Sequence, residues 1–160
     1  MAWQKEATET LSSTVDIITA TVSDKKFYTV MTHEINSGAS QNTPRLGNGG
    51  ADAGSNYAVR FSRDGGADTA QASQTQLGGT QSASSPSFQM MYIFNLSGEE
   101  KLVILNEIVQ NTAGAGTAPK RTEQVGKWVN TSNPIDTIQA FNADSGSFTN
   151  DSNISVLGTD

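Results

Sequence analysis

The chain has a single histidine, His33, and it stands directly before Glu34. A histidine beside a carboxylate is a common pairing for general acid–base catalysis. Both residues fall in a strand-like run, however, and successive side chains of a strand point to opposite faces. The two side chains therefore cannot act together, and no serine shows the nucleophile-elbow pattern of a hydrolase. We predict that His33 is a packed or interfacial side chain.

Carboxylates in pairs could support glycoside hydrolysis, which places two of them around the scissile bond. The available ones are Glu99, Glu100, Glu107, Asp64 and Asp68. Glu99 and Glu100 are neighbours in a turn, where their side chains diverge into water. Glu107 follows an apolar run, and we expect it at a solvent-facing position of a strand. With no aromatic platform nearby in the sequence, we expect no enzymatic activity and no catalytic or cofactor-binding residue.

A calcium loop is the one metal site that the sequence suggests. Asn142, Asp144 and Gly146 have alternate spacing, and oxygen ligands of this kind suit Ca²⁺. The full calcium-loop pattern is not completed, and an ordinary Asx turn accounts for the same residues. The chain has no cysteine, which excludes disulfides and thiolate metal ligands. We expect no metal site and no cofactor, and calcium binding at Asn142 and Asp144 stays an open alternative.

Composition restricts the classes of partner. The 160 residues include 35% hydrophobic and only 16% charged residues, and the formal net charge is −6. A negative chain without a cluster of basic residues repels phosphates, so we expect no nucleic-acid binding. No apolar run approaches about 18 residues, so we expect no membrane association. The opening MAWQKEATET lacks the apolar core of a signal peptide, which predicts synthesis in a cytosol.

Apolar residues recur with a period of two along most of the chain, and helical periodicity is absent. We predict an all-β fold, an antiparallel, jelly-roll-like β-sandwich of about eight short strands. In one strand, one face holds Phe27, Thr29, Met31 and Ile35, and the other holds Tyr28, Val30, Thr32 and Glu34. The strand candidates are Ala7–Leu11, Ile17–Val22, Phe27–Ile35, Tyr57–Ser62, Phe88–Phe94, Lys101–Leu105, Arg121–Asn130, Ile135–Asn142 and Asn153–Leu157.

Two parts are expected in the domain organisation. Residues 1–14 form an N-terminal arm and the first strand, and residues 15–160 form a single sandwich domain. Long polar loops are expected at 36–55 and 69–87, and loops of this length are usually functional, disordered or ordered by a partner. The second loop has no charged residue, which favours contact with a neighbouring subunit over a mobile surface loop.

Partner contacts are therefore predicted at the arm, at the second loop and at a glycine-rich hairpin tip. A tryptophan on an arm is a suitable anchor because it offers a large contact area with few rotamers. The candidate partner-binding residues are Trp3, Asp64, Asp68, Gln74, Gln76 and Leu77.

Several stretches resemble small virion structural proteins of marine tailed bacteriophages. The stretches are Met1–Gln4, Ser55–Arg60, Asp64–Asp68, Pro119–Asn130 and Asn153–Gly158. They span most of the chain, but each is a pattern of strands and turns without a catalytic signature. The resemblance implies a β-sandwich virion protein, made in the host cytoplasm and exposed on the particle, with no enzymatic residues to carry over.

Two functions follow as expectations. The first is a capsid decoration or cement protein, which binds the assembled head and stabilises it by mass action. The alternative is a glycan-binding, host-recognition module of a tail or head fibre. Under either function the partners are other virion proteins, either the major capsid protein or tail and fibre proteins. Further copies of the chain are also expected partners, in a homotrimer or another homo-oligomer.

Overall fold

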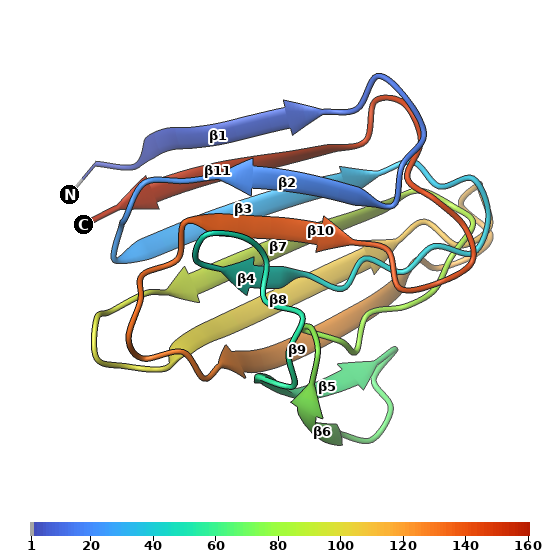
Figure 1. Ribbon diagram of the computed structural model, residues 1–160. Coiled ribbons are helices and arrows are strands. Elements are labelled where there is room, and N and C mark those ends of the chain that lie inside the picture. The colour runs from blue at the N-terminus through green and yellow to red at the C-terminus, as the bar shows by residue number, and fades with distance from the viewer. Residues whose placement is uncertain (1) are drawn as a thin grey trace.

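The computed structural model describes residues 2–160, in which eleven strands form two antiparallel sheets (Figure 1). The larger sheet has the order β1-β11-β3-β7-β8-β9-β5-β6, and the smaller has the order β2-β10-β4. The strands are β1 (Gln4–Thr10), β2 (Ile17–Thr21), β3 (Phe27–Glu34), β4 (Arg45–Gly47), β5 (Tyr57–Arg63), β6 (Thr69–Gln74), β7 (Ser87–Phe94), β8 (Lys101–Val109), β9 (Lys120–Trp128), β10 (Thr137–Phe141) and β11 (Asn153–Thr159). The predicted all-β antiparallel sandwich is confirmed. Residues 2–160 hold no helix long and apolar enough to cross a membrane.

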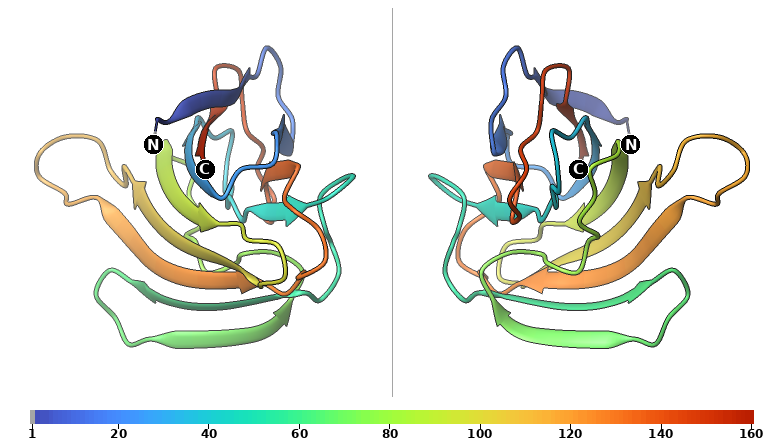
Figure 2. Two further views of the ribbon diagram at one scale, coloured as in Figure 1. Left: turned by 90° about the vertical axis from the view of Figure 1, so that its left-hand side faces the viewer. Right: turned by 90° about the vertical axis from the view of Figure 1, so that its right-hand side faces the viewer.

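The core lies between the two sheets. Tyr28, Val30, Thr32 and Glu34 of β3 are all buried, and His33 lies on the other face, as the alternation predicts. His33 is exposed, which corrects the expectation of a packed side chain, while an interfacial position stays a prediction. The small sheet contributes Ile18, Ala20, Leu46, Ile138 and Ala140 to this core. Eight strands against three leave much of the larger sheet without a second layer, and the two end-on views show the small sheet on one side only (Figure 2).

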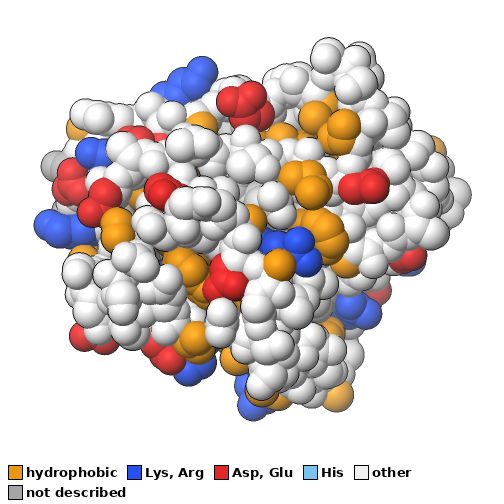
Figure 3. Space-filling model, viewed as in Figure 1, with side chains coloured by type: hydrophobic (Ala, Val, Ile, Leu, Met, Phe, Trp, Pro, Cys, Tyr) orange, Lys and Arg blue, Asp and Glu red, His pale blue; other side chains and the backbone are white. Residues whose placement is uncertain are grey.

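The outer side of the small sheet is mainly uncharged and polar. Figure 3 shows scattered hydrophobic side chains among predominantly neutral atoms on this side. The guanidinium of Arg45 lies 3.6 Å from the ring centroid of Phe141, which covers part of that ring. This side therefore has the polar surface of a water-exposed layer.

The structure corrects the expectation of a polar loop at 69–87. This stretch begins with β6, which pairs with β5 across a hairpin whose tip holds Asp64 and Gly65 at φ of 52° and 76°. The next residues, 77–81, are buried in the chain's own fold rather than free for a neighbouring subunit. Gly79 has a φ of 99°, and a Cβ there would lie 2.5 Å from the ring of Phe61, so only glycine fits.

The other expected loop, 36–55, contains the short strand β4. The first and last strands, β1 and β11, pair with each other, so the two ends of the chain lie side by side (Figure 1). The expected arm is thus largely the edge strand β1, and Trp3 directly precedes it. Met1 of that arm lies outside the described residues.

Candidate docking surface

One face of the larger sheet is apolar and uncovered. On β8 the side chains alternate strictly, with Val103 and Leu105 buried and Leu102 and Ile104 51% and 54% exposed on the opposite face. The same alternation on β7 and β9 adds further exposed apolar residues. We call this surface the open face. Its exposed large apolar residues are Trp3, Phe88, Tyr92, Leu102, Ile104, Ile108 and Val125.

The strand register makes the open face continuous. Ile104 pairs with Tyr92 on β7 and with Val125 on β9, so these three side chains form one row across the sheet. Leu102 pairs with Phe94 in the next row, where the ring of Phe94 lies 5.9 Å from that of Phe27. Neighbouring strands are about 4.8 Å apart, so directly paired side chains contact one another.

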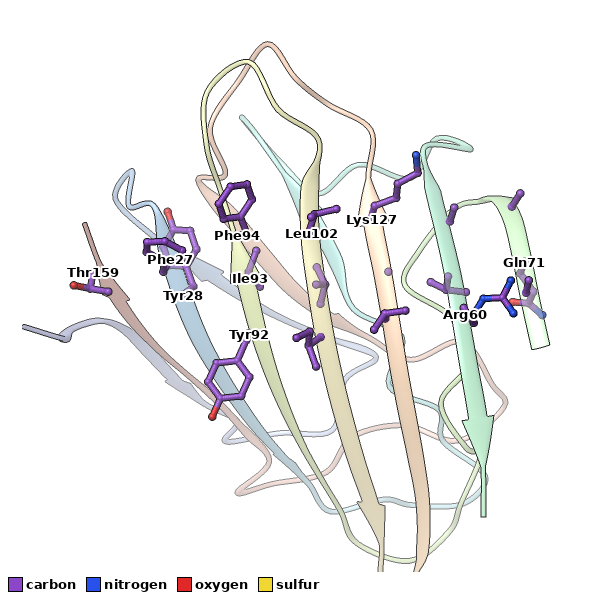
Figure 4. Close-up of a pocket in the computed structure, with 18 of the residues that line it drawn as sticks. Phe27, Tyr28, Arg60, Gln71, Tyr92, Ile93, Phe94, Leu102, Lys127 and Thr159 are labelled. Carbon is purple, nitrogen blue, oxygen red and sulfur yellow. The ribbon is translucent and has the colours of Figure 1, made fainter. Parts of the chain in front are cut away.

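The open face is hollowed into a trough of about 1110 Å³ that runs across the strands (Figure 4). Most of its lining is apolar, and its charged side chains are Arg60 and Lys127, both on the β9–β5 side. Lys127 pairs with Glu100 at 2.7 Å, and Arg60 lies 3.8 Å from Asp68. Because all four side chains are solvent-exposed, these pairs contribute little to stability, and a partner can replace them.

Such a surface is unfavourable in water. Fully burying one large apolar side chain contributes about 1.5–3 kcal/mol, so covering seven that are half exposed would contribute roughly 5–10 kcal/mol. Contiguous apolar patches of this kind mark interaction sites, whereas single exposed hydrophobic residues need no explanation. The open face is therefore the best candidate for a functional surface in the described part of the chain.

A second unusual feature is a buried carboxylate on β3, at one end of the core. Glu34 is fully buried, and it accepts hydrogen bonds from Ser87 Oγ and Asn42 Nδ2. Burial away from water raises the pKa of Glu34, and these hydrogen bonds only partly oppose that effect. Sequence reasoning missed this site because a lone glutamate in a strand gives no sign of its depth.

Glu107 corrects the expectation of a solvent-facing position. Its side chain is 2% exposed, because β8 turns the odd-numbered residues Lys101 to Val109 inward. The carboxylate accepts hydrogen bonds from the backbone N–H of Gln81 and from Thr122 Oγ1, both at 2.8 Å. Burial raises the pKa of Glu107 to about 7, and the nearby charge of Glu34 adds to the rise. This carboxyl group can therefore gain or lose a proton near neutral pH.

The predicted partner-binding residues do not form one site. Trp3 is half exposed and lines the trough, so it lies where a partner could contact it. The predicted partner-binding role of Leu77 is wrong, because Leu77 is completely buried in the core and a partner cannot reach its side chain. Gln76 accepts a hydrogen bond from Arg45 Nη2 at 3.2 Å, and Gln74 donates one to the backbone oxygen of Ala72 at 2.8 Å.

The two hairpin-tip aspartates have separate roles. Asp64 Oδ1 accepts the backbone N–H of Arg121 at 2.8 Å and so ties the β5–β6 hairpin to β9. Asp68 is exposed and faces Arg60 at the edge of the open face. A structural role therefore accounts for Asp64, while Asp68 lies near enough to the open face to contact a partner there.

The possible calcium loop is held together by its own hydrogen bonds. Asn142 Oδ1 accepts the backbone N–H groups of Gln41 and Asp144, and Asn142 Nδ2 donates to the backbone oxygen of Asp144. This is the Asx-turn arrangement. Within residues 2–160, no group of three or more histidine, cysteine or acidic side chains could hold a metal ion.

A second, smaller hollow is polar. It has a volume of about 320 Å³ and lies beside the segment that follows β9. Its lining residues include Asp52, Asn56, Asn130, Thr131, Ser132 and Asn133. Amide and hydroxyl groups of this kind can bind the hydroxyls of a sugar, although the volume is at the lower limit for a ligand site.

Comparisons with protein-family models, with curated proteins and with solved structures found no match to this chain.

Proposed function

We propose that this chain is a non-catalytic structural subunit of a virus particle, a decoration protein of a tailed bacteriophage head that is held in its assembly by the open face. The observation that carries the proposal is the continuous apolar surface of β7, β8 and β9. A chain with so few hydrophobic residues places seven large ones on one uncovered face, and burial in an assembly is what would stabilise them.

Two further features support an assembly role. On the side of the molecule that carries the small sheet, uncharged groups dominate the surface, and they suit close packing against neighbouring subunits at little desolvation cost (Figure 3). The chain also resembles small virion structural proteins in the stretches described above, and those stretches include most of β5 and β9, two strands of the open-face sheet. The proposed partners are other virion proteins and further copies of the chain.

Locating the chain on purified virus particles whose genome encodes it tests this proposal. Cryo-EM is expected to show many copies spread over the head lattice. Particles carrying Ile104→Asp are expected to lose that density, because the substitution places a charge in the middle of the open face. Absence of the wild-type chain from the particle would show that the proposal is wrong.

A host-recognition module on a fibre is the second candidate, and the polar hollow beside Asn130 to Asn133 favours it. Glycan-array binding by the purified chain, lost in Asn133→Ala, would support this function, because Asn133 is exposed and lines the hollow. Density confined to the tail or to vertex fibres would point the same way. The decoration function ranks first because the larger hollow is lined mainly by apolar surface.

A further inference from the structure

We propose that a second copy of this chain covers the open face, so that two larger sheets pack against each other about a two-fold axis. This inference rests on the proposed assembly role of the open face, but it does not depend on the kind of particle. Its basis is the strand pattern, the area and the charges of that face.

The strand pattern predicts a layer on each side of β8. Leu102, Ile104 and Ile108 point outward, and Val103 and Leu105 point inward, so both faces of this strand are apolar. Near-continuous apolar runs are typical of strands that are buried on both faces. The small sheet covers only the inner face, and a second sheet would cover the outer face.

The area fits a two-chain interface. Half of the 150–250 Å² of an aromatic side chain, taken for Trp3, Phe88 and Tyr92, with four half-exposed aliphatic side chains, gives roughly 500 Å² of apolar surface. A standard interface buries about 800 Å² on each partner, of which about 60% is apolar. The open face alone therefore supplies the apolar area that one side of a stable dimer needs.

The charges favour a copy of the same face over a strongly charged partner. Three cation–carboxylate pairs border the apolar residues on the β9–β5 side, so this border is neutral although the whole chain carries a charge of −6. The pairs are Arg60–Asp68, Arg121–Glu123 and Lys127–Glu100. In a two-fold pair each surface meets itself, and a border with both signs is complementary to its own copy.

Sedimentation velocity of the full chain, without any particle present, tests the inference. The wild-type chain is expected to sediment as a dimer, with twice the 16.9 kDa mass of one chain. Ile104→Asp is expected to raise the dissociation constant of the dimer at least about 100-fold, because each copy then buries an unpaired charge in the contact. Ile104 is half exposed in the single chain, so the substitution is expected to leave the fold intact. The far-ultraviolet circular dichroism of the variant is therefore expected to match that of the wild-type chain. Val125→Asp, across the strand pair, is a second variant with the same expectation.

Ile17→Asp is the matched control, since Ile17 is similarly exposed but lies on β2 of the small sheet. It is expected to leave the dimer intact, and equal weakening by Ile17→Asp and Ile104→Asp would overturn the inference. So would a trimer, or a wild-type monomer at about 100 µM, since interfaces of this size bind at micromolar or better. A monomer that still loads onto particles would overturn the pairing alone, and a dimer absent from particles would overturn the proposed function alone.

Discussion

Trp128→Ala is expected to lower the free energy of unfolding by about 4 kcal/mol, the usual cost of truncating a buried tryptophan. Trp128 is 1% exposed at the end of β9, and its indole Nε1–H donates a 2.7 Å hydrogen bond to Asp52 Oδ2. The substitution therefore removes core packing and also one of the donors that hold Asp52. Urea denaturation at neutral pH measures the loss.

Val129→Ala is the control for this prediction. Val129 is the next residue along the chain and is exposed, so its truncation is expected to change stability by less than about 0.5 kcal/mol. Trp128→Phe separates the two effects of the tryptophan, because it keeps most of the apolar volume and removes only the N–H donor. A cost of about 2 kcal/mol is expected for losing this hydrogen bond to a charged group. Equal costs for Trp128→Ala and Val129→Ala would contradict the described packing of Trp128.

Asp52 gives Trp128→Phe a second readout. Burial opposes ionisation of Asp52, but hydrogen bonds from Trp128, Gly54 and Asn56 outweigh it and hold its pKa below the usual value. A carboxylate with a lowered pKa stabilises the fold at neutral pH, and this contribution is lost as the pH falls through the folded-state pKa. Trp128→Phe is expected to raise the pKa of Asp52 and so to reduce the acid sensitivity of the fold.

The sequence predicts strands well where apolar residues alternate with polar ones. All nine predicted strands occur, including β3, in which the separation of His33 from Glu34 follows directly from the period of two. The two strands that sequence reasoning missed are β4 and β6. β6 reads Thr-Ala-Gln-Ala-Ser-Gln and is almost entirely exposed, so it has no apolar face to detect. It forms because the hairpin tip at Asp64 and Gly65 returns the chain along β5.

The open face and the buried position of Glu107 were missed for one shared reason. In the run Leu102 to Leu105 both faces of β8 are apolar, so the sequence does not say which face is covered. Polarity alone suggests that Glu107 points to water. Glu107 lies on the same face of β8 as Val103 and Leu105, however, and this face is buried. The direction of Glu107 depends on whether the odd-numbered or the even-numbered residues of β8 face the small sheet. Only the position of the small sheet shows that the odd-numbered residues do.

Glu107 and Gln89 are neighbouring buried polar side chains on the inner face of the larger sheet. The two residues are directly paired on β8 and β7. Gln89 Nε2 donates to the backbone oxygen of Asn42, but Gln89 Oε1 has no hydrogen-bond partner among the described residues. A buried acceptor without a partner is costly. Burial is the main cause of the raised pKa of Glu107, and the neighbouring side chain of Gln89 acts in the opposite direction.

The raised pKa makes stability depend on pH in a defined direction. Below pH 4.5, the ordinary pKa, Glu107 is neutral in the folded and the unfolded chain, and the fold loses nothing. Between pH 4.5 and about 7 the unfolded chain ionises first, so the fold loses stability as the pH rises. A tenfold change in a protonation equilibrium corresponds to about 1.36 kcal/mol, so the loss from Glu107 is about 3 kcal/mol across this range. The raised pKa of Glu34 acts in the same direction.

Glu107→Gln is therefore expected to stabilise the chain by about 3 kcal/mol at pH 8 and to change little at pH 4. The amide oxygen can still accept from Gln81 and Thr122. For a domain of this size the gain corresponds to a rise in melting temperature of roughly 10 °C. Thermal unfolding at both pH values measures it, with Glu123→Gln on the exposed face of β9 as the control expected to show no such change. A loss of stability at pH 8, or an equal gain at both pH values, would contradict the raised pKa of Glu107. A gain that comes from removing a buried charge must increase as the pH rises.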